Sequence, residues 1–275
     1  MINIGDYIER AIHWLTNNFA SFFDGLSMVV GNFIEGFQQA LFEVPASITI
    51  VVLVLLAWRK AGRNTAIFTL LGLGLIYGMG LWEATMQTLA LVLSSTSLAL
   101  LIGIPLGVWT ARSQRCSKTV RPILDFMQTM PAFVYLIPAV LFFGLGTVPG
   151  AFATIIFAMP PVVRLTGLGI RQVPHEVVEA SQSFGATPWQ LLCKVQLPLA
   201  LPSILTGVNQ TIMMSLSMVV IAAMISAGGL GEVVLKGITQ MKIGQGFEGG
   251  IAVVILAIIL DRITQGIAKG RKRRA

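Results

Sequence analysis

The 275 residues are 55% hydrophobic and only 11% charged, whereas a soluble domain carries about 25% charged residues. This composition excludes a water-covered globular surface and indicates a protein that lies mostly in lipid. The net charge of +7 raises nucleic acid as an alternative partner, so the positions of the basic residues matter. Cys116 and Cys193 lie too far apart to predict a metal motif or a disulfide framework.

The first 44 residues predict an amphipathic helix on the outer surface of a membrane. Asp6 followed by Glu9 is typical of a helix start. Apolar residues then recur at three- and four-residue spacing, at Ile8, Ile12, Leu15, Phe19 and Phe22. Acidic residues outnumber the single Arg10, which suits an exported segment. We therefore expect residues 1–44 to form an external segment that serves as an anchor or contacts a partner.

Seven apolar stretches follow, at about 45–58, 67–82, 86–111, 123–145, 150–163, 204–227 and 249–260. Their continuous apolarity, without alternation of period two, favours helices over a β-barrel. The sequence therefore predicts an all-α integral membrane protein with about seven transmembrane helices. The first stretch is short against the roughly 20 residues that cross a bilayer, so six spans stay an alternative.

The basic residues predict the orientation of these spans. With seven spans, 16 of the 19 lysines and arginines fall on one side, in the loops after spans one, three and five and in the tail. The exceptions are Arg10, Lys236 and Lys242. We therefore expect the N-terminus outside and the C-terminus in the cytoplasm. The basic tail over 264–275 then faces anionic membrane lipid, and no basic soluble domain remains for nucleic acid.

The segment between the fifth and sixth stretches predicts a short cytoplasmic helix. Pro174 suits a first helical turn, and Glu176 and Glu179 place negative charge near the positive end of the helix dipole. We expect this helix to run through Phe184 and to stop at Gly185, a residue suited to a left-handed cap.

A second helix is predicted to begin at Thr187 and Pro188, which are typical of an N-cap and a first turn. We expect it to end before Pro198, because proline lacks the N–H that a helix interior requires. The two helices form a polar helix–turn–helix on the cytoplasmic face.

This hairpin resembles the EAA signature of bacterial ABC import permeases. The signature reads E-A-A, three residues, G, nine residues, I-x-L-P, and the chain has Glu179-Ala180-Ser181, Gly185 and Val195-Gln196-Leu197-Pro198 at that spacing. Ser181 and Val195 depart from it conservatively. In that family the loop is a coupling helix that docks on the ATP-hydrolysing subunit. The resemblance implies this role for Glu176, Glu179, Ala180, Ser181, Phe184, Gly185, Leu197 and Pro198.

Further segments resemble the glycine betaine/proline betaine permeases, namely 88–93, 128–135, 159–161, 216–222 and 260–265. The family implies a type I ABC importer permease fold, with two peripheral helices over 45–82, a core over 83–263 and a coupling loop at about 168–202. It implies a multi-pass protein of the bacterial inner membrane. Its partners are then a second permease copy, two ATP-hydrolysing subunits and an external substrate-binding protein. The implied function is ATP-driven import of glycine betaine, proline betaine or choline.

Two other functions stay open. The same fold could import another small solute such as an amino acid, and an ion-coupled carrier could work without partners. The chain has no G-x-x-x-x-G-K-[ST] phosphate loop, G-x-S-x-G elbow or H-E-x-x-H motif. We therefore expect a non-catalytic subunit without cofactor or metal, with ATP hydrolysis in a partner.

Polar residues inside spans are costly in lipid and mark candidate pathway positions. These are Ser94, Ser97, Gln128, Thr129, Asn209, Gln210 and Ser217, joined by Met218 from a group of adaptable methionines and Tyr135 from an aromatic cluster with Phe133, Phe142 and Phe143. Serine and threonine can instead bond their own helix. Asn209 and Gln210 can instead belong to a dimer contact.

Glycine pairs, two aspartates and one glycine-rich segment give three further predictions. The pairs Gly74 with Gly78 and Gly103 with Gly107 predict close helix packing. Asp125 and Asp261, near the inner ends of spans, are expected to pair with arginines. The segment 228–232 is a docking or gating element, or a plain turn.

Overall fold

The computed structural model describes residues 10, 12, 14–16 and 18–272, with side chains described as far as residue 267. Every regular element in this part of the chain is a helix. The bounds are α2 (Ala20–Phe42), α3 (Ala46–Ala61), α4 (Arg63–Gly78), α5 (Trp82–Arg112), α6 (Gln114–Thr129), η1 (Ala132–Tyr135), α7 (Leu136–Phe143), α8 (Thr147–Arg171), α9 (His175–Ser183), α10 (Pro188–Gln190), η2 (Leu191–Gln196), α11 (Leu197–Ala222), η3 (Ala223–Ile225), α12 (Gly229–Thr239) and α13 (Ile243–Lys272). The predicted all-α class is confirmed.

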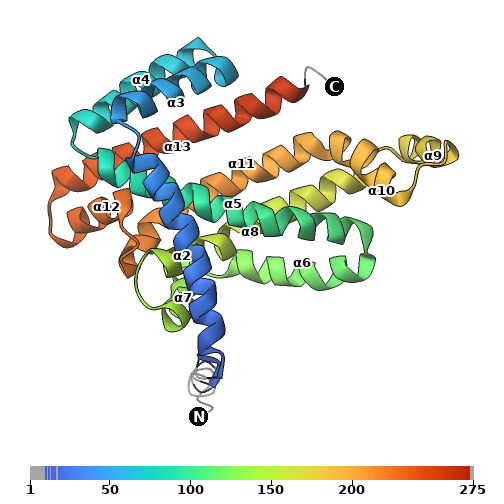
Figure 1. Cartoon of the computed structure of the whole chain (residues 1–275), viewed down its shortest axis with the longest axis horizontal. Coiled ribbons are helices and arrows are strands. Elements are labelled where there is room, and N and C mark those ends of the chain that lie inside the picture. The colour runs from blue at the N-terminus through green and yellow to red at the C-terminus, as the bar shows by residue number, and fades with distance from the viewer. Residues whose placement is uncertain (1–9, 11, 13, 17, 273–275) are drawn as a thin grey trace.

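The core of the bundle consists of α5, α6, α8, α11 and α13, which run roughly side by side (Figure 1). Helix α8 lies against both α5 and α11, and glycines allow the close approach. A methyl group added at Gly107 would lie 2.6 Å from Thr166 Cβ, and one at Gly103 would lie 2.5 Å from Val162 Cγ1. The close packing predicted for Gly103 and Gly107 is therefore confirmed. At Gly74 and Gly78 an added methyl would meet nothing within 4 Å, so for that pair the expectation is wrong within this chain.

Helices α3 and α4 form a peripheral hairpin that packs along α13. Gly62 joins them with φ +97°, a conformation that favours glycine. Gly72 of α4 faces Ile255, and Gly266 of α13 comes so close to α3 that an added methyl would lie 2.3 Å from the Lys60 carbonyl oxygen. The hairpin is thus fixed to the core mainly by α13, and α4 also contacts α5.

Helix α2 runs across the bundle rather than along it (Figure 1), and the bend between α2 and α3 is 98°. Its buried residues Val30 and Ile34 pack against Leu91, Ala151 and Ala222 of the core. An amphipathic surface helix accounts for this arrangement, although the predicted helix start at Asp6 lies outside the described residues. The role of the 1–44 segment stays a prediction.

The predicted span over 123–145 is broken in the structure. Helix α6 ends at Thr129, and α7 follows at a bend of 111°. The break falls at Met130, which has an extended ψ of 135° because the next residue is Pro131. In the described residues four helices are long and apolar enough to cross a membrane, or up to six if each bent pair is one span. The number seven therefore stays a prediction.

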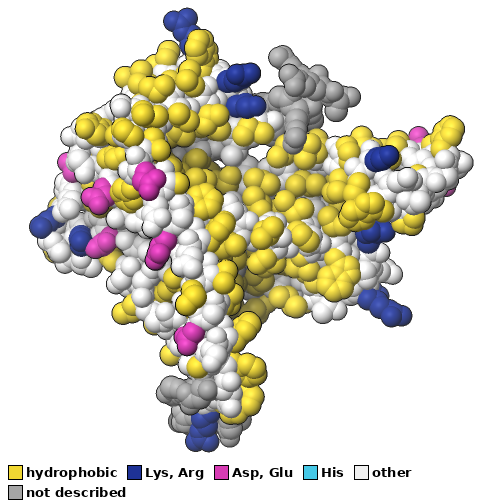
Figure 2. All heavy atoms as spheres, in the orientation of Figure 1, with side chains coloured by type: hydrophobic (Ala, Val, Ile, Leu, Met, Phe, Trp, Pro, Cys, Tyr) yellow, Lys and Arg dark blue, Asp and Glu magenta, His cyan; other side chains and the backbone are white. Residues whose placement is uncertain are grey.

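The two ends of the bundle differ in charge. We call the end with Arg112 and Arg171 the inner end and the end with α12 the outer end. Arg171 Nη1 donates to the Thr110 carbonyl oxygen over 3.2 Å, which ties α8 to α5 at the inner end. Figure 2 shows acidic side chains gathered toward the outer end and most basic ones elsewhere. The orientation of these two ends relative to the membrane stays a prediction.

Candidate functional site

A helical hairpin extends from the inner end of the bundle (Figure 1). We call residues 174–198 the coupling hairpin. Its first helix, α9, has no buried residue. The Phe184 side chain at its tip is 92% exposed, although burying a phenylalanine is favourable. A partner that covers this side chain would gain the free energy of burying it.

The two serine hydroxyls of α9 donate to backbone carbonyl oxygens of the same helix. Ser181 Oγ donates to the Val177 carbonyl oxygen over 2.8 Å, and Ser183 Oγ donates to the Glu179 carbonyl oxygen over 2.9 Å. The Glu179 carboxylate also lies 3.2 Å from His175 Nδ1. Exposed pairs of this kind add little stability. The Glu176, Glu179 and Ala180 side chains are exposed.

Gly185 ends α9 as the sequence predicts. Its φ is +80°, and no neighbour would hinder a side chain there, so the backbone conformation alone explains the glycine. The Gly185 N–H donates to the Gln182 carbonyl oxygen and the Ala186 N–H to the Ser181 carbonyl oxygen. These two bonds form the Schellman cap. Pro174 is the residue before α9 rather than within its first turn.

The second helix begins as predicted but does not end where expected. Thr187 Oγ1 accepts from the Gln190 N–H, and the Gln190 side chain accepts from the Thr187 N–H, which makes a capping box. The expected end before Pro198 is wrong, because the π-helical segment η2 leads directly into α11 at Leu197. Pro198 stands in the first turn of α11, where its missing N–H costs little.

The root of the coupling hairpin is packed firmly on the core. Leu192 is 3% exposed and lies in an apolar cluster with Ile170 of α8 and with Ala200 and Ile204 of α11. The motif residue Leu197 packs at the edge of this cluster, and Pro198 is exposed beside it. Trp189, which the sequence reasoning missed, is 68% exposed and adds a second aromatic surface to the hairpin. The sequence signal for Trp189 was its position directly after Pro188, in the first turn of the second helix of the hairpin.

Four of the candidate pathway residues lie exposed on the bundle. Gln210 and Ser217 belong to an exposed stripe of α11 that includes Thr206 and Met213 at helical spacing and continues to Met224 of η3. Gln128 and Thr129 are exposed at the end of α6. The Thr129 and Ser217 hydroxyls donate to carbonyl oxygens of their own helices, at 3.1 and 3.0 Å. These two hydroxyl groups thus have acceptors within the chain.

Three other candidates lie inside the subunit. Ser94 and Met218 are fully buried, and Tyr135 is 5% exposed. The Tyr135 hydroxyl donates to the Met127 carbonyl oxygen, which ties η1 to α6. Ser94 Oγ donates to the Leu91 carbonyl oxygen over 3.1 Å. These residues pack the core of one subunit, while Ser97 is half-buried at its margin.

The aromatic residues near α7 stack on one another instead of forming a cage. The rings of Phe143 and Phe152 are stacked with centroids 4.1 Å apart, and those of Phe142 and Phe23 are stacked at 4.5 Å. The ring of Tyr135 contacts Phe157 edge to face. The cluster therefore joins α2, α7 and α8.

Asn209 takes part in a polar cluster between α11 and α13. Its Nδ2 donates to Asp261 Oδ1 over 2.9 Å, and its Oδ1 accepts from Thr264 Oγ1 over 2.5 Å. Gln265 Nε2 donates to the same carboxylate over 2.8 Å. The expected arginine partner of Asp261 is therefore wrong, because amide donors satisfy the carboxylate. Asn209 faces α13 and not the exposed stripe of α11.

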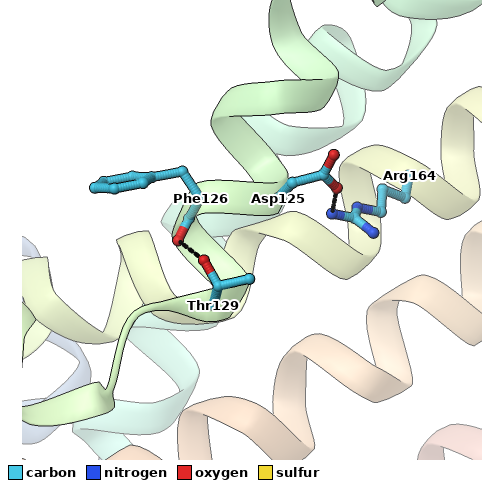
Figure 3. A network of polar contacts seen from close by, with 4 residues as sticks. All are labelled: Asp125, Phe126, Thr129 and Arg164. Atoms are coloured by element: carbon cyan, nitrogen blue, oxygen red, sulfur yellow. Dashed lines mark hydrogen bonds and ion pairs between the residues drawn. The ribbon is translucent and has the colours of Figure 1, made fainter.

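Asp125 does pair with an arginine. Arg164 Nη2 of α8 lies 2.5 Å from Asp125 Oδ1 of α6 (Figure 3). The expectation of an ion pair is confirmed for this carboxylate.

The segment 228–232 starts α12 and packs on α5. Gln87 Oε1 accepts from the Gly229 N–H over 3.0 Å, and Thr88 Oγ1 accepts from the Leu230 N–H over 2.8 Å. An added methyl at Gly229 would lie 2.5 Å from Thr88 Oγ1. Close packing and positive φ at Gly228 and Gly229 thus account for these glycines.

Most of this chain has the same fold as a chain of a solved transporter. A chain of the MetNI methionine ABC transporter, in a structure titled as an inward-facing conformation, superposes with a TM-score of 0.63 at 23% identity. The match covers 70% of this chain and 95% of that one. This chain therefore shares the fold of that transporter chain, which is the type I ABC importer permease fold.

Sequence comparison gives the family. Residues 103–273 match the family described as "Binding-protein-dependent transport system inner membrane component". The chain is 50% identical to the glycine betaine/proline betaine transport system permease protein ProW of Escherichia coli, over 100% of this chain and 77% of that protein. It is also 50% identical to the glycine betaine transport system permease protein OpuAB of Bacillus subtilis, over 99% and 97%. The chain thus belongs to the inner-membrane components of binding-protein-dependent transport systems.

Proposed function

We propose that this chain is the permease subunit of an ATP-driven importer of quaternary ammonium osmoprotectants, such as glycine betaine, proline betaine and choline. The observation that carries the proposal is the exposed coupling hairpin, with Phe184 92% exposed at its tip. Identity of 50% over the whole chain to permeases named for glycine betaine supports the substrate class.

The coupling hairpin docks in a groove of a separate ATP-hydrolysing subunit. Glu176, Glu179 and Ala180 face that partner from α9, and Phe184 supplies apolar contact area. Two permease copies then receive two ATP-hydrolysing subunits. ATP binding shifts the pair between inward-open and outward-open states, because ATP binds one of these states more tightly than the other.

The solute passes between the two permease copies. The exposed polar residues Gln128 and Thr129 of α6 and Gln210 and Ser217 of α11 line this path. Ser94, Tyr135 and Met218 support it from inside the subunit, and Ser97 stands at its margin. An external binding protein delivers the solute and supplies most of the selectivity.

Uptake of radiolabelled glycine betaine by liposomes tests this function. The liposomes contain the chain with its ATP-hydrolysing subunit, and loaded binding protein is added outside. We expect uptake to require ATP and to be lost in Glu179→Lys. Glu248→Lys, the same change at an exposed residue of the outer end, serves as the control.

Uptake by the permease alone would identify an ion-coupled carrier and overturn the proposal. ATP-driven uptake of an amino acid in place of betaine would keep the architecture and overturn the substrate class.

A further inference from the structure

The ion pair of Asp125 and Arg164 joins α6 to α8. Asp125 is on α6 and Arg164 on α8, and their side chains are 64% and 41% exposed. Figure 3 shows the carboxylate and the guanidinium pointing toward each other, while the Phe126 ring extends to the opposite side of α6. The pair is therefore accessible and not sealed in the subunit core.

Arg164 lies within a candidate span. It precedes the end of α8 at Arg171 by seven residues, or about 10 Å at 1.5 Å per residue. Asp125 stands three and four residues before Gln128 and Thr129, so it shares their face of α6. The pair thus lies on the inner side of the proposed pathway.

The surroundings of the pair are positively charged and partly apolar. Arg121, Arg171 and both members of the pair line one pocket of about 240 Å³ between α6 and α8. Asp125 is the only carboxylate among the described residues that line it. The hydroxyls of Thr110 and Ser117 and the side chains of Val120, Leu124, Val163 and Leu168 complete the walls.

A carboxylate beside a guanidinium is complementary to a zwitterion. The planar guanidinium binds carboxylates through paired hydrogen bonds, and a carboxylate attracts a quaternary ammonium without needing a donor. An exposed ion pair contributes little net stability, so a solute of matching charges can replace the contact. A betaine carries these two charges one methylene group apart.

We propose that Asp125 and Arg164 form a transient contact for the zwitterionic solute on the inner side of the pathway. The Arg164 guanidinium takes the carboxylate of the solute, and the Asp125 carboxylate takes its quaternary ammonium. This inference rests on the proposed function and adds residues of the permease itself to substrate recognition.

The ratio of betaine imported to ATP hydrolysed tests whether the pair contacts the solute or only clamps α6 to α8. The variants are Asp125→Asn, Arg164→Gln and the double variant, in which an amide pair can still hydrogen-bond. With saturating loaded binding protein, we expect ATP hydrolysis to persist while betaine imported per ATP falls about tenfold, the effect of one lost charge-assisted bond. Arg262→Gln, the same change at an exposed arginine near the inner end of α13, should leave the ratio unchanged.

A cysteine in place of Leu168 reports directly whether the solute occupies the pocket, because Leu168 lines the same pocket and is 41% exposed. Cys116 and Cys193 are first replaced by serine. We expect glycine betaine to slow alkylation of Leu168→Cys, sorbitol to have no effect, and the double variant to abolish the protection.

An unchanged ratio in all three variants, an equal fall in Arg262→Gln, or absence of protection would overturn the contact while leaving the importer intact. Failure of the unmodified assembly to import betaine would overturn both.

Discussion

Replacing Phe184 by alanine is expected to weaken docking of the ATP-hydrolysing subunit without unfolding the permease. The side chain is 92% exposed in the isolated chain, so its loss removes almost no internal packing. Fully burying a phenylalanine contributes about 1.5–3 kcal/mol. If the partner covers this side chain, the dissociation constant rises about 10- to 100-fold, since 1.4 kcal/mol is one factor of ten.

The assay is titration of the ATP-hydrolysing subunit onto the purified permease, followed by betaine uptake at several subunit concentrations. Phe247→Ala is the matched control, because Phe247 is 69% exposed near the outer end and far from the coupling hairpin in sequence. Equal affinities for Phe184→Ala and the unmodified chain would refute the reasoning. Loss of thermal stability in Phe184→Ala would also refute it, because it would mean that the residue packs inside the permease.

Three further substitutions test the packing. Gly107→Leu forces atoms against Thr166, 2.6 Å from an added methyl, and should cost about 1–3 kcal/mol of unfolding free energy in a denaturant titration. In Gly185→Ala the alanine must adopt φ +80°, which costs about 1–2 kcal/mol. This cost destabilises the end of α9, so proteolysis should become faster in the coupling hairpin alone. Asp261→Leu leaves Asn209 Nδ2 without its acceptor and should lower stability by about 1–3 kcal/mol, read by thermal unfolding. Unchanged stability at Gly107 or Asp261, or uniform proteolysis at Gly185, would contradict these contacts.

The coupling hairpin was predictable because its signals are local. A left-handed cap needs glycine at one position, and Gly185 follows directly from that rule. Thr187 and Gln190 make a capping box over four residues. The prediction that the second helix ends before Pro198 was wrong for a physical reason. A π-helical turn is rare, and its wider hydrogen-bonding pattern let the chain carry the proline into α11.

The pathway residues were less predictable because exposure depends on neighbours far away in the chain. Asn209 and Gln210 are adjacent in the sequence, yet one bonds Asp261 of α13 and the other is exposed. Hydropathy treats both as polar residues in an apolar helix. Similarly, the apolar run over 123–145 gave no sign of a 111° bend beyond the single Pro131. Only the packing of α6, η1 and α7 on α8 distinguishes a broken helix from a straight one.

The unbroken passage from α10 through η2 into α11 connects the coupling hairpin to the outer end of the bundle by one continuous helical segment. From Pro188 to Ile225 the chain forms one helical rod of 38 residues, about 57 Å long. Gly207, near the midpoint, rests against α8 so closely that an added methyl would lie 3.0 Å from Val162 Cα. On either side of it, Gly169 and Gly150 of α8 approach Ser203 and Ala222 comparably closely. A displacement of the inner tip would therefore be passed to the outer end by α11 and α8 moving together.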